Sequence, residues 1–201
     1  MSSTDPQNAR VLGVILAGGA SRRMGGNDKF LLSLGGKKLL SHIIERIEPQ
    51  VDNLILNAQN TDIECALEVV PDIILDPQGN PYGPLGGLFT ALEYAKQKGF
   101  TSVVTAPCDT PFIPHDFVEK LSEHHNSSVV VASSNGRMHP VLAKWDLSLT
   151  DDLRSVLKND QRKMMAWVNK HSPARVIWDQ VPDPFLNINT EEDLAQAEKL
   201  L

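Results

Sequence analysis

The chain of 201 residues has little of several features that mark common protein classes. Its only two cysteines, Cys65 and Cys108, are too far apart for a metal-binding pair, and we expect both to be reduced thiols in a cytoplasmic protein. Its 19 basic residues are outnumbered by 25 acidic ones, which argues against a nucleic-acid-binding protein. No apolar run is long enough for a membrane span or a secretory signal. We therefore expect no nucleic acid and no membrane among its partners.

Size and composition are those of one globular domain. The chain is long enough for one well-packed core and short for two. Its content of 41% hydrophobic and 22% charged residues is ordinary for such a domain. Residues 1–10 are polar, and we expect a flexible tail there, followed by a single domain over residues 11–201.

The two commonest nucleotide-binding motifs are also missing. There is no Gly-x-Gly-x-x-Gly, and Lys29 is followed by Phe30 instead of Ser or Thr, which excludes a Walker loop. The chain has instead an apolar run at residues 11–16, which predicts a buried strand. Gly18 and Gly19 follow this run and allow the backbone to turn sharply.

The residues after this strand combine glycine with positive charge. Arg22, Arg23 and Lys29 stand among two pairs of glycines, which is typical of a loop that wraps a polyphosphate. Glycine pairs alone also occur in ordinary surface turns, but basic residues at a strand end favour phosphate binding. Neighbouring side chains on an extended loop point in opposite directions, so we expect only one of Arg22 and Arg23 to face the phosphates.

Strand and helix patterns alternate through the first two thirds of the chain. Residues 39–47 carry apolar side chains at helical spacing, and Pro84 stands in the first turn of a helix that Gly99 ends. This alternation implies right-handed βαβ units, and so a three-layer α/β/α fold with a mainly parallel, Rossmann-like sheet. Ligands of such sheets bind at the carboxyl ends of the strands. Further strands are expected at residues 53–57, 73–75 and 102–106, and further helices at residues 61–67 and 115–125.

The last third of the chain is less regular. Thr190 is the expected N-cap of a final helix, because acidic residues fill the first turn after it. No repeat or linker interrupts the sequence, which again favours one domain. Strands are expected at residues 129–132 and 140–143 and, at an edge of the sheet, 175–178; helices are expected at residues 147–157 and 164–168.

The stretch that follows the first strand matches a longer pattern. It reads Leu-Ala-Gly-Gly-Ala-Ser-Arg-Arg-Met-Gly-Gly-Asn-Asp-Lys, which resembles the signature of enzymes that join an NTP to a phosphorylated acceptor and release pyrophosphate. Within these nucleotidyltransferases it is similar to the molybdenum cofactor guanylyltransferase family. The resemblance implies the nucleotide-diphospho-sugar transferase type of fold. It also implies a nucleotide-binding part over about residues 11–125 and an acceptor-binding part over about residues 126–201.

Asp109 is the candidate metal ligand and catalytic carboxylate. It follows an apolar strand, and Pro107 and Pro111 stiffen the turn around it. A nucleotidyl transfer must neutralise the α-phosphate and the leaving pyrophosphate, and Mg²⁺ does so with one or two carboxylates plus phosphate oxygens. The segment also resembles the metal-binding segment of the family. The alternative is that Asp109 caps the next helix.

The resemblance assigns further residues to the nucleotide. By their chemistry, Lys29 suits the α-phosphate, and Arg22 and Arg23 suit the β- and γ-phosphates, with one of the two arginines facing inward. For Asn57 and Asp76, which end expected strands, the alternative is a turn-forming role. The predicted catalytic residues are Lys29, Asp109 and Arg23, and the predicted nucleotide contacts are Leu16, Ala17, Gly18, Gly19, Lys29, Asn57, Asp76 and Asp109.

The expected acceptor site comes from two short motifs. Arg137 and His139 belong to a segment that resembles the Arg-x-His-Pro loop of the family, and we expect it to line the acceptor pocket. Asn187 and Asn189 belong to a segment that resembles its Asn-x-Asn-Thr turn, and we expect it beside the metal. The alternatives are a surface histidine at residue 139 and simple helix capping near Asn189.

The resemblance implies transfer of GMP from GTP to the molybdenum–molybdopterin cofactor with Mg²⁺, releasing pyrophosphate and forming a guanine dinucleotide. Its implied partners are GTP, this acceptor, other proteins of molybdenum cofactor biosynthesis and molybdoenzyme chaperones. One alternative is the same chemistry with CTP or a sugar-phosphate acceptor. Another is a non-catalytic nucleotide-binding chaperone of molybdoenzymes, against which Lys29 and Asp109 argue, because binding alone requires neither.

Overall fold

A single seven-stranded sheet lies at the centre of the computed structural model, which describes residues 9–17 and 32–201. The strands follow the order β5-β4-β1-β6-β8-β7-β9. A separate two-stranded hairpin is formed by β2 (Ser33–Leu34) and β3 (Lys37–Lys38). The strands of the large sheet are β1 (Val11–Leu16), β4 (Asn53–Asn57), β5 (Glu68–Val70), β6 (Ser102–Pro107), β7 (Val129–Ser134), β8 (Arg137–Asp146) and β9 (Ala174–Ile177).

Parallel pairing predominates in this sheet, as predicted. β5, β4, β1 and β6 run parallel to one another, and β9 runs parallel to β7. β8 is the exception, because it is antiparallel to both β6 and β7. β1 is central, and its neighbours β4 and β6 end beside it at the same edge.

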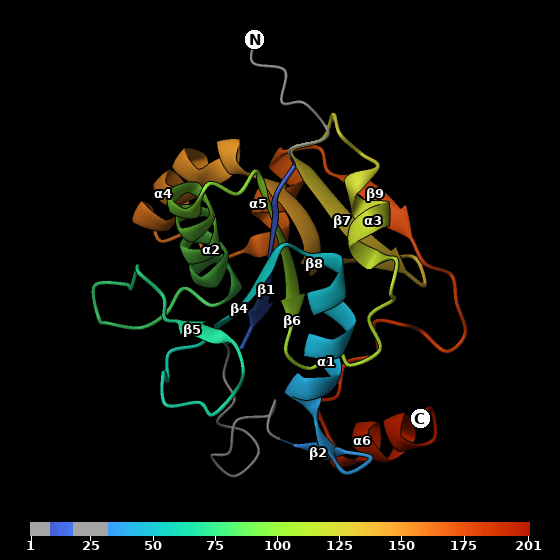
Figure 1. Cartoon of the computed structure of the whole chain (residues 1–201). Coiled ribbons are helices and arrows are strands. Elements are labelled where there is room, and N and C mark those ends of the chain that lie inside the picture. The colour runs from blue at the N-terminus through green and yellow to red at the C-terminus, as the bar shows by residue number, and fades with distance from the viewer. Residues whose placement is uncertain (1–8, 18–31) are drawn as a thin grey trace.

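Helices cover both faces of the sheet (Figure 1). Helices α2, α4 and α5 pack on one face, in a core that contains Leu12 and Leu16 of β1. Helices α1 and α3 pack on the other, in a core that contains Ile15. The three-layer α/β/α prediction is therefore confirmed. The α-helices are α1 (Leu39–Ile47), α2 (Pro84–Lys98), α3 (Phe117–Ser122), α4 (Thr150–Lys158), α5 (Met164–Lys170) and α6 (Glu191–Glu198), with short 3-10 turns at Glu48–Gln50 and Leu147–Leu149.

A small third core joins the C-terminal helix to the β2–β3 hairpin. Leu34 and Leu39 pack with Ile188 and with Ala197 of α6. Figure 1 shows α6 beside β2, at the end of the molecule toward which β1 runs. The sheet's carboxyl edge is thus flanked by the last helix of the chain.

Helix α2 follows its expected local chemistry. Gly83 precedes it with φ of 62°, Pro84 occupies its first turn, and Gly99 closes it with φ of 73° in the left-handed region. It is the longest helix among the described residues, with 15 residues. Across the described ranges, no helix has both the length and the apolar character needed to cross a bilayer.

Two predictions between β4 and α2 are wrong. Residues 61–67 form no helix; the chain is irregular there, and every second side chain from Ile63 onward packs toward the core. Residues 73–75 are not a strand of the sheet, because β5 lies earlier and ends before Pro71, which has no amide hydrogen for the ladder. Ile73 and Leu75 remain 59% and 44% exposed.

The last third differs from the prediction mainly in β8. This strand has 10 residues and begins at Arg137, so Arg137 and His139 lie in a strand and not in a loop. β9 is an edge strand, as predicted. Neither Cys65 nor Cys108 forms a disulfide among the described residues, and the reduced state of both stays a prediction.

Candidate functional site

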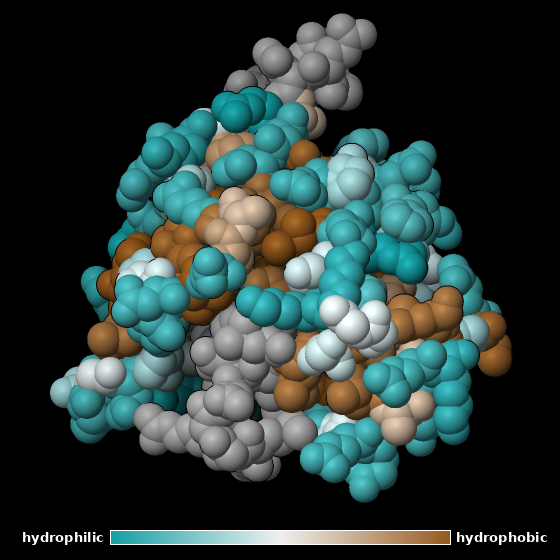
Figure 2. All heavy atoms as spheres, turned by 60° about the horizontal axis from the view of Figure 1, so that its bottom comes forward, coloured by the Kyte–Doolittle hydropathy of each residue, from teal (hydrophilic) through white to brown (hydrophobic). Residues whose placement is uncertain are grey.

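The carboxyl ends of β1, β4 and β6 bring the predicted nucleotide residues together. Leu16 lies in register with Asn57 on one side and with Pro107 on the other. The amide of Ala17 donates to Asn57 O at 2.9 Å, and the amide of Cys108 donates to Leu16 O at 3.2 Å. Figure 2 faces this end of the molecule and shows apolar surface between hydrophilic patches. The backbone at residues 16–17 is therefore flanked by Asn57 and by the segment that carries Asp109.

The segments that carry Asp109 and Asn187 contact each other, while the place of both beside a metal stays a prediction. The amide of Ile188 donates to Asp109 O at 2.9 Å. The buried hydroxyl of Thr110 donates to Asn187 Oδ1 at 2.9 Å and lies 3.5 Å from Asp109 Oδ1. Thr110 thus ties the carboxylate at the end of β6 to the carboxamide of the segment before α6. Both side chains offer the oxygen ligands that a hard divalent cation prefers.

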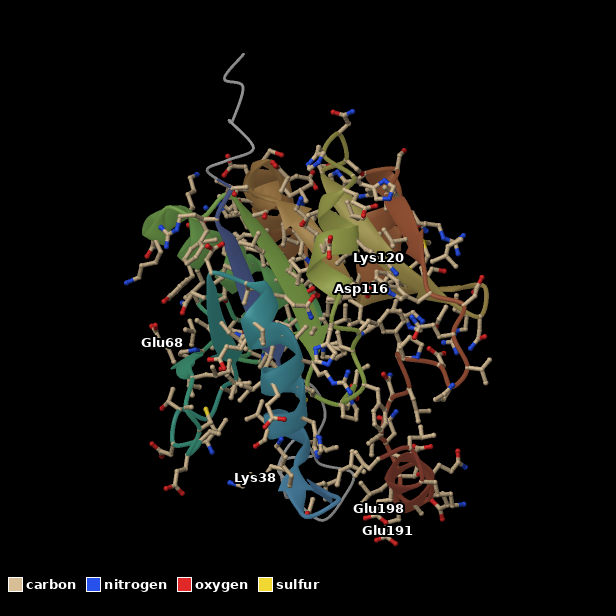
Figure 3. The ribbon with its side chains drawn as sticks, turned by 45° about the vertical axis from the view of Figure 1, so that its right-hand side comes forward. Lys38, Glu68, Asp116, Lys120, Glu191 and Glu198 are labelled. Carbon is tan, nitrogen blue, oxygen red and sulfur yellow. The ribbon has the colours of Figure 1, made fainter. Side chains whose placement is uncertain are left out.

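Asp109 does not cap the next helix. Helix α3 begins at Phe117, and its N-cap residue is Asp116, which stands seven residues after Asp109. Asp116 also forms an ion pair of 2.7 Å with Lys120, and the two side chains lie together on α3 (Figure 3). The capping alternative for Asp109 is therefore excluded.

Asn57 is held by a network that spans β4 and the segment after β5. Its side chain is 2% exposed, and its Nδ2 donates to Val70 O at 3.0 Å and to Asp72 Oδ1 at 2.9 Å. These bonds cross between chain segments, so the turn-forming alternative does not apply to Asn57. Burial raises the pKa of Asp72, while hydrogen bonds from Asn57 and Gln59 oppose this shift.

The first turn of α2 approaches this network closely. A Cβ atom added to Gly87 would lie 2.3 Å from Asn57 Oδ1 and 2.9 Å from Leu16 Cδ2. A Cβ atom added to Gly86 would lie 3.1 Å from Asp72 Oδ2. The two glycines therefore let the helix begin directly against the ends of β1 and β4.

Asp76 organises the loop before α2. Its Oδ1 accepts from the amides of Gln78 and Asn80 at 2.9 and 2.7 Å, and its Oδ2 accepts from Arg162 Nη2 at 2.7 Å. The guanidinium of Arg162 also lies 4.9 Å from the centre of the Tyr82 ring. The hydrogen bond from Arg162, followed by that from the Asn80 amide, lowers the pKa of Asp76 to about 2. The turn-forming alternative is thus correct for Asp76, and its contact with nucleotide stays a prediction.

His139 belongs to a hydrogen-bonded cluster beside the segment that leads to Asn187. Ser134 Oγ donates to Asp183 Oδ2 at 2.9 Å and lies 2.8 Å from His139 Nε2. Because the Ser134 hydroxyl donates its one proton to Asp183, Ser134 Oγ can only accept from His139. The Nε2 atom of His139 is therefore protonated and donates to Ser134 Oγ. The His139 ring also packs on Phe185, with 5.2 Å between ring centres. Burial lowers the pKa of His139, and Asp183 opposes the shift.

Of the other two predicted acceptor residues, Arg137 borders this cluster, because it lies opposite Ser134 in the β7–β8 ladder and its charge lowers the pKa of His139. Arg137 is exposed at the start of β8. The Asn189 amide donates to Asp193 Oδ2 at 2.9 Å, and Thr190 with Asp193 forms the capping box of α6. The N-cap prediction for Thr190 is confirmed, and the acceptor roles of Arg137 and Asn189 stay predictions.

Part of the predicted site lies outside the described residues, namely Gly18, Gly19, Arg22, Arg23 and Lys29. Sequence reasoning also missed several residues that support the site. Thr110 stands directly after Asp109 in the same motif, so the sequence could have indicated that its hydroxyl supports the site. Asp72, Ser134 and Asp183 carry no motif, and only strand pairing and the packing of the loop after β9 bring them to Asn57 and His139.

Comparison with known proteins shows similarity over almost the whole chain. The model of the MobA-like NTP transferase domain matches residues 13–176. A molybdenum cofactor guanylyltransferase of Mesorhizobium japonicum is 42% identical over 95% of this chain and 96% of its own length. One from Cereibacter sphaeroides is 38% identical over 96% of this chain and 97% of its own.

Solved structures show the same fold. Molybdopterin-guanine dinucleotide biosynthesis protein A from Archaeoglobus fulgidus superposes with a TM-score of 0.75, covering 94% of this chain and 97% of its own. At 24% identity this likeness supports the fold alone. The family match spans most of the chain and includes residues 13–16 of β1, Asn57 and Asp109. The chain therefore belongs to the family of MobA-like NTP transferase domains.

Proposed function

We propose that this protein transfers the GMP unit of GTP to the molybdenum–molybdopterin cofactor and releases pyrophosphate in the cytoplasm. The observation that carries the proposal is Asp109, held against Asn187 at the end of β6 and adjacent to the backbone of Leu16 and Ala17. Relatives at 38–42% identity named molybdenum cofactor guanylyltransferase support the choice of base and acceptor.

The reaction requires no general base, because the terminal phosphate of the acceptor is already anionic near neutral pH. The work of the protein is to bring two anionic groups together and to offset the charge of the α-phosphate and pyrophosphate. We assign Lys29 to the α-phosphate and Arg23 to the β- and γ-phosphates. Asn57 and the backbone at residues 16–19 bind the nucleoside, with Asp76 shaping the loop beside it.

The donor set at the end of β6 fits Mg²⁺. Asp109 supplies a carboxylate and Asn187 an amide oxygen, while the described ranges contain no group of three or more His, Cys, Asp or Glu residues placed so that they could hold a metal ion. Such a sparse oxygen set suits an ion that keeps several waters and takes phosphate oxygens as further ligands. Asp109, aided by Asn187, would hold the ion, which supplies positive charge to the phosphates.

The acceptor part extends over about residues 126–201 of the single domain. His139, held by Ser134 and packed on Phe185, lies in β8 beside the chain segment that leads to Asn187. Arg137 and Asn189 are further candidate contacts for the acceptor. GTP and the molybdenum–molybdopterin acceptor are the proposed substrates, and other cofactor-biosynthesis proteins and molybdoenzyme chaperones are proposed partners.

Pyrophosphate release with each of the common NTPs and purified molybdenum–molybdopterin tests the proposal. We expect release with GTP and Mg²⁺ that requires the acceptor. Preferential turnover with CTP would overturn the base assignment. Nucleotide binding without any release would favour a non-catalytic role.

A further inference from the structure

Strand β9 is the last strand in the order of the large sheet and leaves one edge of that sheet open (Figure 1). In a parallel ladder, alternate residues of a strand bond to its neighbour. The amide of Trp178 donates to Ser133 O of β7 at 2.8 Å, so the backbone of the even-numbered residues faces β7. The backbone groups of Arg175, Ile177 and Asp179 therefore point away from the sheet, and in residues 9–17 and 32–201 no group bonds to them. Such a row of unpaired groups can pair with another strand.

The side chains of these three residues share one face of β9, because every second side chain of an extended chain points the same way. Ile177 is in the middle and is 60% exposed. Arg175 and Asp179 flank it, and both are exposed. Arg175 Nη2 donates to the neutral Ser133 Oγ at 2.8 Å, and neither charged residue forms an ion pair with any described residue. The exposed stretch thus has a positive charge, an apolar side chain and a negative charge in that order.

This order of charges is complementary to itself when the chain is reversed. A free edge is commonly protected by Lys or Pro, and β9 contains neither. The charge of Arg175 would also repel a second strand unless that strand placed a carboxylate opposite it. Contacts across a twofold axis are reciprocal, so one strand with both charges can satisfy both of them in its own copy.

We propose that β9 pairs with β9 of a second copy of this chain, in an antiparallel ladder centred on Ile177. In this register Ile177 lies opposite its own copy, and Arg175 lies opposite Asp179 of the second copy at both ends of the ladder. The backbone groups that pair are those that face the open edge. A ladder centred one residue earlier or later would set Arg175 or Asp179 opposite Ile177 and leave the charges without partners.

The proposed interface is small. It consists of one short strand from each copy, with Ile177 and, in the loop that follows, Val181, which is 98% exposed. Interfaces at this end of the size range are weak, so we expect a reversible dimer with a dissociation constant on the order of micromolar. Three strands separate β9 from β1 in the sheet, so the pairing leaves the carboxyl ends of β1, β4 and β6 open.

Sedimentation equilibrium of the full chain over a range of protein concentrations tests this inference. We expect the wild type to form a dimer. Arg175→Asp and Asp179→Arg, made separately, should each raise the dissociation constant about tenfold or more, because like charges then lie opposite each other at both ends of the ladder. The double variant Arg175→Asp with Asp179→Arg exchanges the two charges, so its dissociation constant should return to within about threefold of the wild-type value.

The matched control is Lys158→Asp, which changes the net charge as Arg175→Asp does. Lys158 is exposed at the end of α4, away from the edge formed by β9, and its substitution should leave the dissociation constant unchanged. The double variant serves as a control for damage to β9 itself, because a second charge reversal would not repair a strand that the first had unfolded.

Each contrary result would overturn the inference. A wild type that stays monomeric at every concentration would exclude the dimer. A dimer that neither single variant weakens would lie on another surface. A double variant that dimerises no better than the single ones would exclude the register centred on Ile177. The measurement needs neither nucleotide nor acceptor, so its outcome is independent of the proposed function.

Discussion

At the scale of single residues, Gly87 marks the tightest packing of the site. A methyl group there would overlap Asn57 Oδ1 and crowd Leu16, both of which are buried. We expect Gly87→Ala to lower the free energy of unfolding by about 1–2 kcal/mol, because overpacking outweighs the gain in helix propensity. Gly86→Ala is the matched control, since its methyl meets its nearest atom at 3.1 Å, and we expect a change within about 0.5 kcal/mol. Urea unfolding measures both, and equal losses would contradict the account.

Asp109 is the residue on which we expect catalysis to depend most. A carboxamide keeps the shape and one acceptor oxygen, so Asp109→Asn should leave the melting temperature nearly unchanged. It removes the negative charge that the proposed metal requires, and we expect turnover to fall by roughly 10²–10³ or more. Pyrophosphate release and thermal unfolding are measured on one preparation. Near-normal turnover in Asp109→Asn would end its assignment as the metal ligand.

At the scale of elements, Arg162 connects the turn between α4 and α5 to the loop before α2. It pairs with the buried carboxylate of Asp76 at 2.7 Å and with Asp160 at 2.8 Å, and it packs over Tyr82. The exposed guanidinium of Arg162 thus connects a segment of the proposed acceptor part to the loop before α2, which carries Asp76.

Loss of Arg162 should loosen that loop. In Arg162→Ala we expect faster hydrogen exchange at the amides of Gln78 and Asn80, because Asp76 loses its charged partner. Arg154→Ala is the matched control: Arg154 also packs on an aromatic ring, Phe89, and pairs with Glu93, but it does not touch the loop. Unchanged exchange in Arg162→Ala, or equal changes in both variants, would show that Arg162 does not hold the loop.

Elements were predictable from sequence where periodicity and length agreed. The apolar run of β1 lies buried at the sheet centre, and Pro84 and Gly99 bound α2 as their backbone preferences require. The stretch 61–67 was misread as a helix, although its inward side chains recur every second residue, which is the period of an extended chain. The apolar residues 73–75 were misread as a strand, because sequence alone does not reveal that Pro71 ends β5.

Only the parts of the site that lie within recognisable motifs were predictable from the sequence. The segment around Asp109 and the segment around Asn187 lie far apart in sequence, and the family resemblance led to the expectation that both border the metal site. The hydrogen bonds that orient them depend on register. Asp72 reaches Asn57, and Asp183 reaches Ser134, because strands and loops from distant parts of the chain meet at one edge. Such pairings follow from tertiary packing and leave no local pattern.

At the scale of the whole molecule, acid should weaken the fold through Asp76. Its folded pKa of about 2 lies below the ordinary value of 3.8, so the unfolded chain binds more protons between these values. The stabilisation is present above about pH 4 and is lost as the pH falls toward 2. Asp76→Asn should therefore show a smaller loss of stability over this window. Identical pH profiles of wild type and variant, measured by denaturant unfolding, would contradict this origin.

The transfer requires both parts of the molecule, because the proposed nucleotide-binding part and the proposed acceptor-binding part meet where Thr110, next to Asp109, donates to Asn187. The most direct measurement uses GTP labelled at its α-phosphorus, with Mg²⁺ and molybdenum–molybdopterin. The account predicts that the label appears in the acceptor as a guanine dinucleotide, with one pyrophosphate released for each label transferred. Labelled CTP that transfers in place of GTP, or GTP that is bound without any transfer, would contradict it.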